Sequence, residues 1–424
     1  MDSVFMEYFA TRLGEAGVHV LRFEFLITII AIVGSCVWIR RIFLIWRHFD
    51  EFPSIATLSP CMEGDAWPSV AIVIPARDEA GQIVAAVRSH LRTDYPNVTL
   101  VAVNDRSSDE TGPLLDQLAA EDDRLRVVHV EELPVGWLGK THAMEIGARA
   151  TNSEWLLFTD GDVLFQPEVL RKTVSLAVRT KSEHVVATPT LVIDSILEAI
   201  ASFGFLASLA EYAPYWKVQD PKSWVYMGVG AFNLVRRDAF DSIGGFGHLR
   251  LSVDDDMRLG QALKWHGHRS MVVIGDRQIS VKWQDGAVGI IKGLEKNSFA
   301  ALEFNLSVTL ILIALGWIWA AGPWVGVLFG TGWTRIIGLT GLAATVAVGL
   351  EERRNAPMPF WVPLTMPLGY GIINIALLNS VRATCYHRGI VWRDHFYPLQ
   401  LLKAHVSERR RWLRNAWRAS RESP

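Results

Sequence analysis

Cysteine is scarce in this chain of 424 residues, which contains only three. Cys36, Cys61 and Cys385 lie far apart and lack the paired spacing of zinc ligands, so we expect neither a disulfide framework nor a zinc site. Basic residues are not in excess either, because 42 Lys and Arg face 44 Asp and Glu. A protein that reads a phosphate backbone would carry a strongly basic domain, so we expect no nucleic-acid partner.

Two glycine-rich nucleotide motifs are also missing. No Gly-x-Gly-x-x-Gly follows the first strand expected in the central region, and no Gly-Lys-Ser/Thr phosphate loop has the usual spacing. These absences count against dinucleotide oxidoreductases and P-loop enzymes. Any nucleotide must therefore be held by other residues.

Apolar residues, in contrast, make up half of the chain. The segment from Phe23 to Trp46 is almost wholly apolar, is long enough to cross a bilayer and lacks a small-residue cleavage site, so it predicts a retained anchor. Arg40, Arg41 and Arg47 lie in and just after its C-terminal half. The positive-inside rule then places the central region in the cytoplasm.

A second apolar block runs from Leu306 to Leu350, with glycine and proline breaks that fit two spans. Pro359 to Val381 could also cross, but its prolines and glycines favour a re-entrant or interfacial segment. The tail from Arg382 has ten Lys or Arg against three acidic residues, which favours the cytoplasmic side. The alternative for this tail is a solvated basic end without lipid contact.

These patterns divide the chain into five parts. We expect an N-terminal segment with the anchor (1–48), a linker (49–68), a cytoplasmic catalytic domain (69–300), a C-terminal apolar region of two or three segments (301–381) and a basic cytoplasmic tail (382–424).

The central region is expected to fold as an α/β domain. Short β-branched runs alternate with helical stretches, as in a parallel sheet with crossover helices. The expected strands are Val70 to Ile74, Val98 to Val103, Arg126 to Val130, Trp155 to Thr159 and Val185 to Ala187. The expected helices are Glu79 to Leu91, Asp109 to Ala119, Thr141 to Ala150 and Pro167 to Val178.

Acidic residues follow three of these strands, as Asp78-Glu79, Asn104-Asp105 and Asp160-Gly161-Asp162. The carboxyl ends of parallel strands share one edge, so a single crevice could collect them. Asp160 and Asp162 could hold Mg²⁺ or Mn²⁺ and leave positions open for diphosphate oxygens. The alternative is an ordinary Asx-type turn.

Three further positions could carry chemistry. Asp105 could accept hydrogen bonds from a base or ribose, or it could be a turn residue. Lys140, at an expected helix start, could meet a diphosphate, or it could be a solvated lysine. One carboxylate of Asp254 to Asp256 could remove a proton from an acceptor hydroxyl, although these acids also suit a helix cap.

Taken in order, these motifs carry a resemblance. Pro75 to Glu79, Val103 to Asp105, Asp160 to Asp162 and Asp255-Asp256 resemble the successive motifs of family 2 inverting glycosyltransferases with the GT-A fold. Residues 104–109 and 136–141, together with the flanking apolar segments, most resemble the hopene-associated glycosyltransferases, and more distantly the ceramide glucosyltransferases.

The resemblance implies a role for each matched position on the donor side. Pro75, Ala76 and Glu79 would border the nucleotide, and Asp105 would contact its uracil or ribose end. Asp160 and Asp162 would serve the Mg²⁺ or Mn²⁺ ion, with Asp160 also beside the nucleotide sugar.

On the acceptor side the resemblance makes Asp256 the base, in preference to Asp255. One departure from the family is the lack of a Gln/Arg-x-x-Arg-Trp motif after these acids. Glu295-Lys296-Asn297 stands in its place, so Lys296 is the candidate for the missing diphosphate-binding cation.

The implied function is an inverting, metal-dependent transfer of a sugar from a nucleotide sugar, with UDP as the expected carrier, to a membrane lipid. A hopanoid or related lipid is the first candidate acceptor, and ceramide or polyprenyl phosphate is the alternative. A membrane nucleotidyl- or phosphotransferase and a non-catalytic sugar-nucleotide-binding membrane protein are rivals from other classes. The expected location is a bacterial inner membrane, and the sequence predicts no oligomeric state.

An apolar stretch within the catalytic region, Ile193 to Trp216, would split the site if it crossed the membrane. We expect an interfacial helix instead, with lipid contacts from its apolar side chains. The alternative is a buried helix of the catalytic core. The side chains expected to meet lipid are Phe203, Phe205, Leu206 and Leu209.

Overall fold

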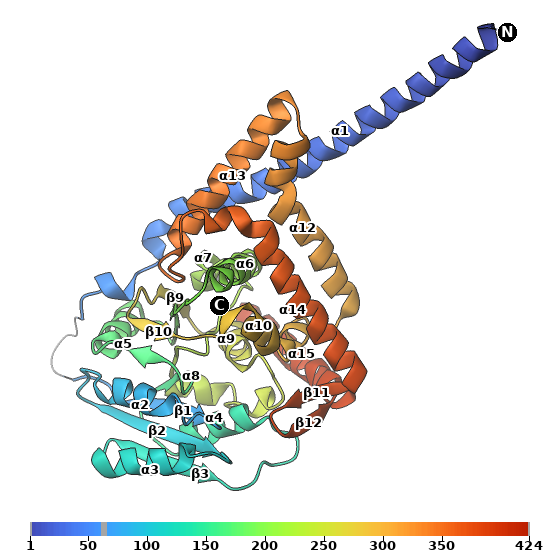
Figure 1. The fold of residues 1–424 in the computed structure, drawn as a ribbon. Coiled ribbons are helices and arrows are strands. Elements are labelled where there is room, and N and C mark those ends of the chain that lie inside the picture. The colour runs from blue at the N-terminus through green and yellow to red at the C-terminus, as the bar shows by residue number, and fades with distance from the viewer. Residues whose placement is uncertain (1, 61–65, 423–424) are drawn as a thin grey trace.

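The computed structural model describes residues 2–60 and 66–422 (Figure 1). Met1, residues 61–65 of the expected linker, with Cys61, and the last two residues of the expected tail lie outside the described residues.

A seven-stranded sheet forms the centre of the catalytic region, in the order β3-β2-β1-β4-β8-β6-β9. The five expected strands correspond to β1, β2, β3, β4 and β6 and run parallel to one another, whereas β8, which was not expected, runs antiparallel to both β4 and β6. A strand entering from the opposite end can pair with both neighbours without a crossover helix. The strands are β1 (Val70–Ala76), β2 (Val98–Asp105), β3 (Leu125–Val130), β4 (Trp155–Phe158), β6 (His184–Thr188), β8 (Asn233–Arg236) and β9 (Ser270–Ile274).

Helices cover both faces of this sheet. Side chains alternate along β1, so Ile72 and Ile74 join one core, while Ala71 and Val73 join another. The first core includes α2 (Ile83–Leu91), α3 (Thr111–Glu121) and α5 (Val169–Thr180). The second includes α4 (Gly139–Arg149), α8 (Arg237–Ser242) and α9 (Asp255–Trp265). The four expected helices correspond to α2, α3, α4 and α5.

The region also contains a second, small sheet and, besides α6 (Ile196–Tyr212), three further helices. The small sheet has the order β5-β10-β7. Its strands are β5 (Leu164–Phe165), β7 (Thr190–Leu191) and β10 (Ile279–Val281), and the helices are α7 (Trp216–Gln219), α10 (Gly286–Glu295) and α11 (Ser298–Ala301).

Five helical segments in the described part of the chain are long and apolar enough to cross a membrane. Three of them, in α1 (Asp2–Arg47), α12 (Leu306–Phe329) and α13 (Gly332–Glu352), pack together on one side of the molecule (Figure 1). The predicted anchor lies in α1, and the two predicted spans correspond to α12 and α13. The other two candidate segments are Ile196–Gln219 and Val362–His387.

From Met366 onward, the stretch expected to be re-entrant or interfacial (Pro359 to Val381) forms an unbroken helix, α14 (Met366–His387). Pro363 and Pro367 lie before or in its first turn, where a missing backbone N–H costs little. These prolines therefore do not break α14, and the re-entrant or interfacial placement of the segment stays a prediction. Helix α14 crosses α6 (Ile196–Tyr212) closely, since a Cβ on Gly204 would lie 2.6 Å from the carbonyl oxygen of Gly369.

The lipid-facing side chains expected on α6 are not exposed. Phe203 is buried and stacks on Trp38 of α1, and Phe205 packs against Trp283. The structure thus corrects this prediction, and α6 resembles the buried helix that was its alternative. The physical reason is that α1, α10 and α14 cover the apolar face of α6, which the pattern of one segment cannot reveal. Leu206 and Leu209 are also half-buried.

The expected tail is not a free end. After α14 the chain forms a hairpin of β11 (Gly389–Trp392) and β12 (His395–Pro398), and then the helix α15 (Leu399–Glu422), which packs against α9. Leu413 of α15 joins the core under the main sheet. The apolar stripe of the basic helix therefore meets protein, and the basic residues lie mainly on its outer face.

His184 provides a test of acid stability in the sheet. Its side chain is fully buried between Ser270 and Asn233, with Nε2 2.6 Å from the Asn233 Oδ1 atom, and burial lowers the His184 pKa to about 4. The unfolded chain binds this proton at a pKa near ~6.5. Stability should therefore fall as the pH drops from about 6.5 toward 4, by up to ~1.4 kcal/mol per pH unit from this group.

The measurement is the midpoint of thermal unfolding in detergent between pH 7.5 and 5. We expect a shallower pH dependence for His184→Gln than for the wild type. His129→Gln, at an exposed position, should keep the wild-type slope. Equal slopes for the wild type and His184→Gln would show that this imidazole is not the acid-sensitive group.

Candidate active site

A pocket of about 200 Å³ lies at the carboxyl ends of β1, β2 and β4. It collects every residue expected to contact the nucleotide or the metal, although their roles stay predictions. These residues are Pro75, Ala76, Glu79, Asp105, Lys140, Asp160, Asp162 and Lys296.

Strand register explains the convergence. Ala76, the last residue of β1, pairs with Asn104 near the end of β2, so the loops after both strands leave the sheet together. Beyond β4, the Asp160 N–H donates to the Gly230 carbonyl oxygen at 3.1 Å. That bond anchors the Asp160 loop to the segment before β8.

Three carboxylates that line the pocket, those of Glu79, Asp160 and Asp162, lie close enough to repel one another. Burial, and then the charges of Asp160 and Glu79, raise the pKa of Asp162 to about 7, and burial raises the pKa of Glu79. A divalent cation would relieve this repulsion, and carboxylate oxygens suit Mg²⁺ or Mn²⁺. No three His, Cys, Asp or Glu side chains are grouped to hold a metal in the described residues. The residues therefore fit an ion held by Asp160 and Asp162 with substrate phosphates, as Mg²⁺ sites often are.

Lys140 is not the solvated lysine that was its alternative. Its Nζ lies 2.6 Å from Asp160 Oδ1 and 3.5 Å from Asp255 Oδ2. Burial opposes the charged form, but these carboxylates outweigh it and raise the pKa of Lys140. The Leu138 N–H donates to the Arg250 carbonyl oxygen at 2.8 Å and fixes the start of α4. Lys140 thus connects the donor-side and acceptor-side acids.

The acid pair lies behind the main pocket, in a smaller cavity that it shares with Lys140 and Asp160. Asp256 Oδ2 accepts a hydrogen bond from the Gly230 N–H at 2.8 Å, which holds the carboxylate in place. Burial raises the pKa of both Asp255 and Asp256. Asp254 makes no side-chain cap and instead forms an ion pair with Arg258 at 2.9 Å.

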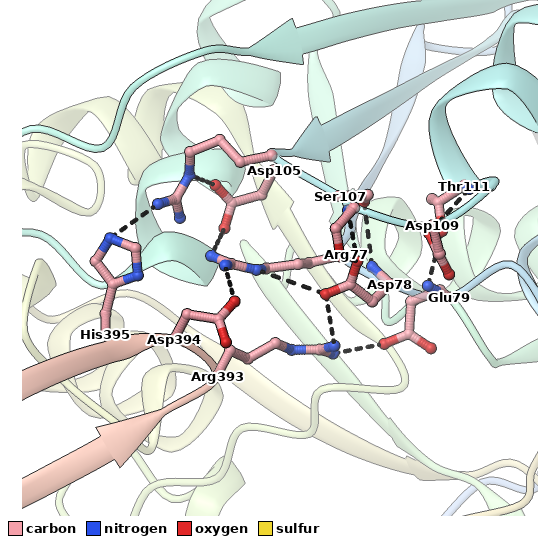
Figure 2. Close-up of polar contacts among 12 residues, drawn as sticks. Arg77, Asp78, Glu79, Asp105, Ser107, Asp109, Thr111, Arg393, Asp394 and His395 are labelled. Carbon is pink, nitrogen blue, oxygen red and sulfur yellow. Dashed lines mark hydrogen bonds and ion pairs between the residues drawn. The ribbon is translucent and has the colours of Figure 1, made fainter.

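Sequence reasoning missed four residues that line the pocket: Arg77, Trp392, Arg393 and Tyr397. Trp392 and Arg393 lie in the β11–β12 hairpin, after the last apolar stretch. Their hairpin lies across the pocket from β1, and Arg393 points at the Asp78 and Glu79 carboxylates (Figure 2). No local sequence pattern predicts that this hairpin contacts the loop after β1, because Arg393 and Glu79 lie more than 300 residues apart in the chain.

Lys296, the candidate for the missing diphosphate-binding cation, also lines this pocket. Its Nζ lies 4.0 Å from the centre of the Trp392 ring. Burial, and then the charge of Lys140, lower the pKa of Lys296 to about 8.

Comparison with known proteins gives a consistent result. The model of the family described as "Glycosyltransferase like family 2" matches residues 68–301, more than half of the chain. A beta-monoglucosyldiacylglycerol synthase from Trichormus variabilis is 29% identical over 210 residues, which cover 48% of this chain and 43% of that protein. A 4,4'-diaponeurosporenoate glycosyltransferase from Staphylococcus haemolyticus is 30% identical over 101 residues, 24% of this chain and 26% of that one. The chain therefore spans less than half the length of these relatives.

Among solved structures, a mannosyltransferase from Pyrobaculum calidifontis in complex with GDP-Man and Mn²⁺ resembles this chain with a TM-score of 0.48 and 17% identity. The match covers 84% of this chain and 99% of that one, and at this level it bears on neither donor nor metal. The family match, the mixed sheet and the order of the acidic motifs agree. The chain belongs to family 2 of the glycosyltransferases, and its catalytic domain has the GT-A fold.

Proposed function

We propose that this protein moves a sugar from a nucleotide sugar to a hydroxyl group of a membrane lipid, with inversion at the sugar carbon. One observation carries the proposal: Lys140 contacts both Asp160 of the donor pocket and Asp255 of the acid pair. A donor in the pocket and a base behind it would thus lie on two sides of one reacting carbon.

The chemistry follows from these positions. The Asp256 carboxylate takes the proton of the acceptor hydroxyl, and the hydroxyl oxygen forms a bond to the sugar C1 atom. The bond from C1 to the diphosphate oxygen breaks on the opposite face, which inverts the configuration. Lys140 and Lys296 stabilise the negative charge of the departing nucleoside diphosphate. When bound at Asp160 and Asp162, Mg²⁺ or Mn²⁺ would supply further charge neutralisation there.

A lipid acceptor is supported by the apolar helices and by the relatives. Five segments could enter a membrane, and one relative's name specifies a glucosylated diacylglycerol as its product. We propose a bacterial inner-membrane location with residues 69–300 in the cytoplasm. A UDP-sugar is the first donor and a hopanoid or related lipid the first acceptor to test, with ceramide and polyprenyl phosphate next.

The experiment uses the purified protein in lipid nanodiscs with Mg²⁺ or Mn²⁺, a panel of sugar nucleotides and lipid extracts. Release of nucleoside diphosphate with a matching hexose-type mass gain on a lipid would support the proposal. Transfer of the nucleotide itself to a product would instead indicate a nucleotidyltransferase. Binding without turnover for every donor and lipid would favour a non-catalytic sugar-nucleotide-binding protein.

Metal dependence gives a direct prediction. Chelation with EDTA should abolish transfer, and Asp162→Asn should lower kcat/KM by about 100-fold or more, because loss of charge stabilisation at a leaving group costs roughly 3 kcal/mol. Added Mn²⁺ should restore the chelated wild type but not the variant. Asp123→Asn, at an exposed position, is the matched control. Full activity of the wild type in EDTA would refute the metal site.

A further inference from the structure

The β11–β12 hairpin makes polar contacts with the loops after β1 and β2, including Arg393 Nη1 to Asp78 Oδ2 at 3.8 Å. Arg393 Nη2 lies 3.0 Å from Glu79 Oε1, Asp394 Oδ2 lies 3.1 Å from Arg77 Nη2, and His395 Nε2 lies 3.2 Å from Arg106 Nη1. Figure 2 shows these contacts between the hairpin and the two loops. The hairpin therefore forms part of the wall of the donor pocket, to which it contributes Trp392, Arg393 and Tyr397.

The hairpin also arranges two cations at the pocket wall. Arg393 extends into the pocket from its turn, and the Trp392 ring holds the Lys296 ammonium by a cation–π contact of 4.0 Å. In the described part of the chain, Lys296 has no carboxylate within ion-pair distance. An anionic ligand stabilises the Lys296 ammonium in this half-buried position more than it would stabilise a fully solvated ammonium, because the local dielectric constant is lower.

The backbone of the turn adds an independent observation. Arg393 has φ +51, in the left-handed region, where glycine is the favoured residue of a two-residue hairpin loop. A bulky residue there costs roughly 1 to 3 kcal/mol and is retained where its side chain has a use. The Arg393 side chain is thus in the pocket at the expense of hairpin stability.

We propose that Arg393 and Lys296 bind the diphosphate of a nucleoside-diphosphate ligand, and that the β11–β12 hairpin positions both side chains at the pocket. This inference rests on the proposed function for its ligand class. The guanidinium exchanges its contacts with Asp78 and Glu79 for phosphate oxygens, to which Arg can bind through two parallel N–H groups. The hairpin of the C-terminal region thus provides a cation in place of the Gln/Arg-x-x-Arg-Trp motif, which is missing after the acid pair.

The test compares nucleoside diphosphates, monophosphates and free nucleosides of uridine and guanosine. Affinities are measured by calorimetry with the full-length protein in nanodiscs and Mg²⁺. Arg393→Gly is the decisive variant, because glycine suits the backbone at this position and should keep or raise the midpoint of thermal unfolding. We expect it to weaken diphosphate binding tenfold or more, to leave nucleoside binding within threefold, and so to reduce the preference for diphosphate. Arg393→Lys should recover part of the loss.

Matched outcomes separate this inference from the proposed function. Arg388→Gln alters an exposed arginine at the base of the same hairpin and should bind all ligands as the wild type does. Unchanged diphosphate affinity in Arg393→Gly, or an equal loss for all ligands, would overturn the role of Arg393 while the proposed function stands. A wild-type protein that binds no nucleoside diphosphate would overturn the proposed function and this inference with it.

Discussion

Replacing Asp256 by asparagine should lower kcat for sugar transfer by about 10² to 10⁴-fold, the range that a general base contributes. Asparagine keeps the size of the side chain and can still accept the Gly230 N–H, which lies 2.8 Å from the carboxylate in the native protein. It cannot take a proton from the acceptor hydroxyl. Donor binding should be retained, because Asp256 does not line the main pocket.

The measurement is a single-turnover assay in nanodiscs, together with the affinity for nucleoside diphosphate. Asp255→Asn provides the comparison, since Asp255 lies 3.5 Å from Lys140 and its loss should act mainly through that lysine. We expect Asp255→Asn to change donor affinity along with kcat. If Asp255→Asn abolishes transfer with binding intact and Asp256→Asn stays active, the roles of the two acids are reversed.

Glu303→Gln should lower the free energy of unfolding by about 3 kcal/mol, because removing one partner of a largely buried ion pair leaves its cations uncompensated. Glu303 contacts Arg409 at 3.1 Å and also pairs with Arg410 of α15, and it lies 3.8 Å from Arg258 of α9. Burial opposes its ionisation, but the arginines outweigh it and lower the Glu303 pKa. Its carboxylate is thus the link between the C-terminal helix and the helix that begins with the acid pair.

A double substitution measures how strongly the Glu303 and Arg409 side chains stabilise each other. Arg409 is buried and also donates to Ser252 at 2.8 Å, in the loop that precedes α9. Arg409→Met should be less harmful when combined with Glu303→Gln than the sum of the two changes, since it removes a charge that the first change left unpaired. Thermal unfolding in detergent is the measurement, and Glu408→Gln, in an exposed pair with Arg250, is the control. Strictly additive losses would show that the two side chains act independently.

Much of the site could be predicted from sequence because its residues follow strands. A buried strand has a local pattern, and its carboxyl end is where a parallel sheet places ligands. Glu79, Asp105 and Asp160 were expected together for this reason, and they line one pocket. The apolar spans in α12 and α13 were equally visible, since their composition alone distinguishes them.

The wrong prediction concerns the partners of a segment. The apolar pattern of α6 suggested lipid contact, yet Phe203 stacks on Trp38, far away in the chain. The proline content of the last apolar stretch is a different case: Pro367 lies in the first turn of α14, where it is tolerated, and the membrane placement of that stretch stays a prediction. An apolar face is buried in either case, and local periodicity does not say whether lipid or protein covers it.

The sequence by itself determined the family, the catalytic domain between apolar segments and the acids at the strand ends, because each has a local pattern of period or spacing. Only the tertiary structure decided that Arg393 contacts Glu79, that Lys140 joins Asp160 to Asp255, and that α15 docks on α9. Contacts between residues distant in the chain produce no periodic sequence pattern, because they depend on how the helices and strands pack in three dimensions.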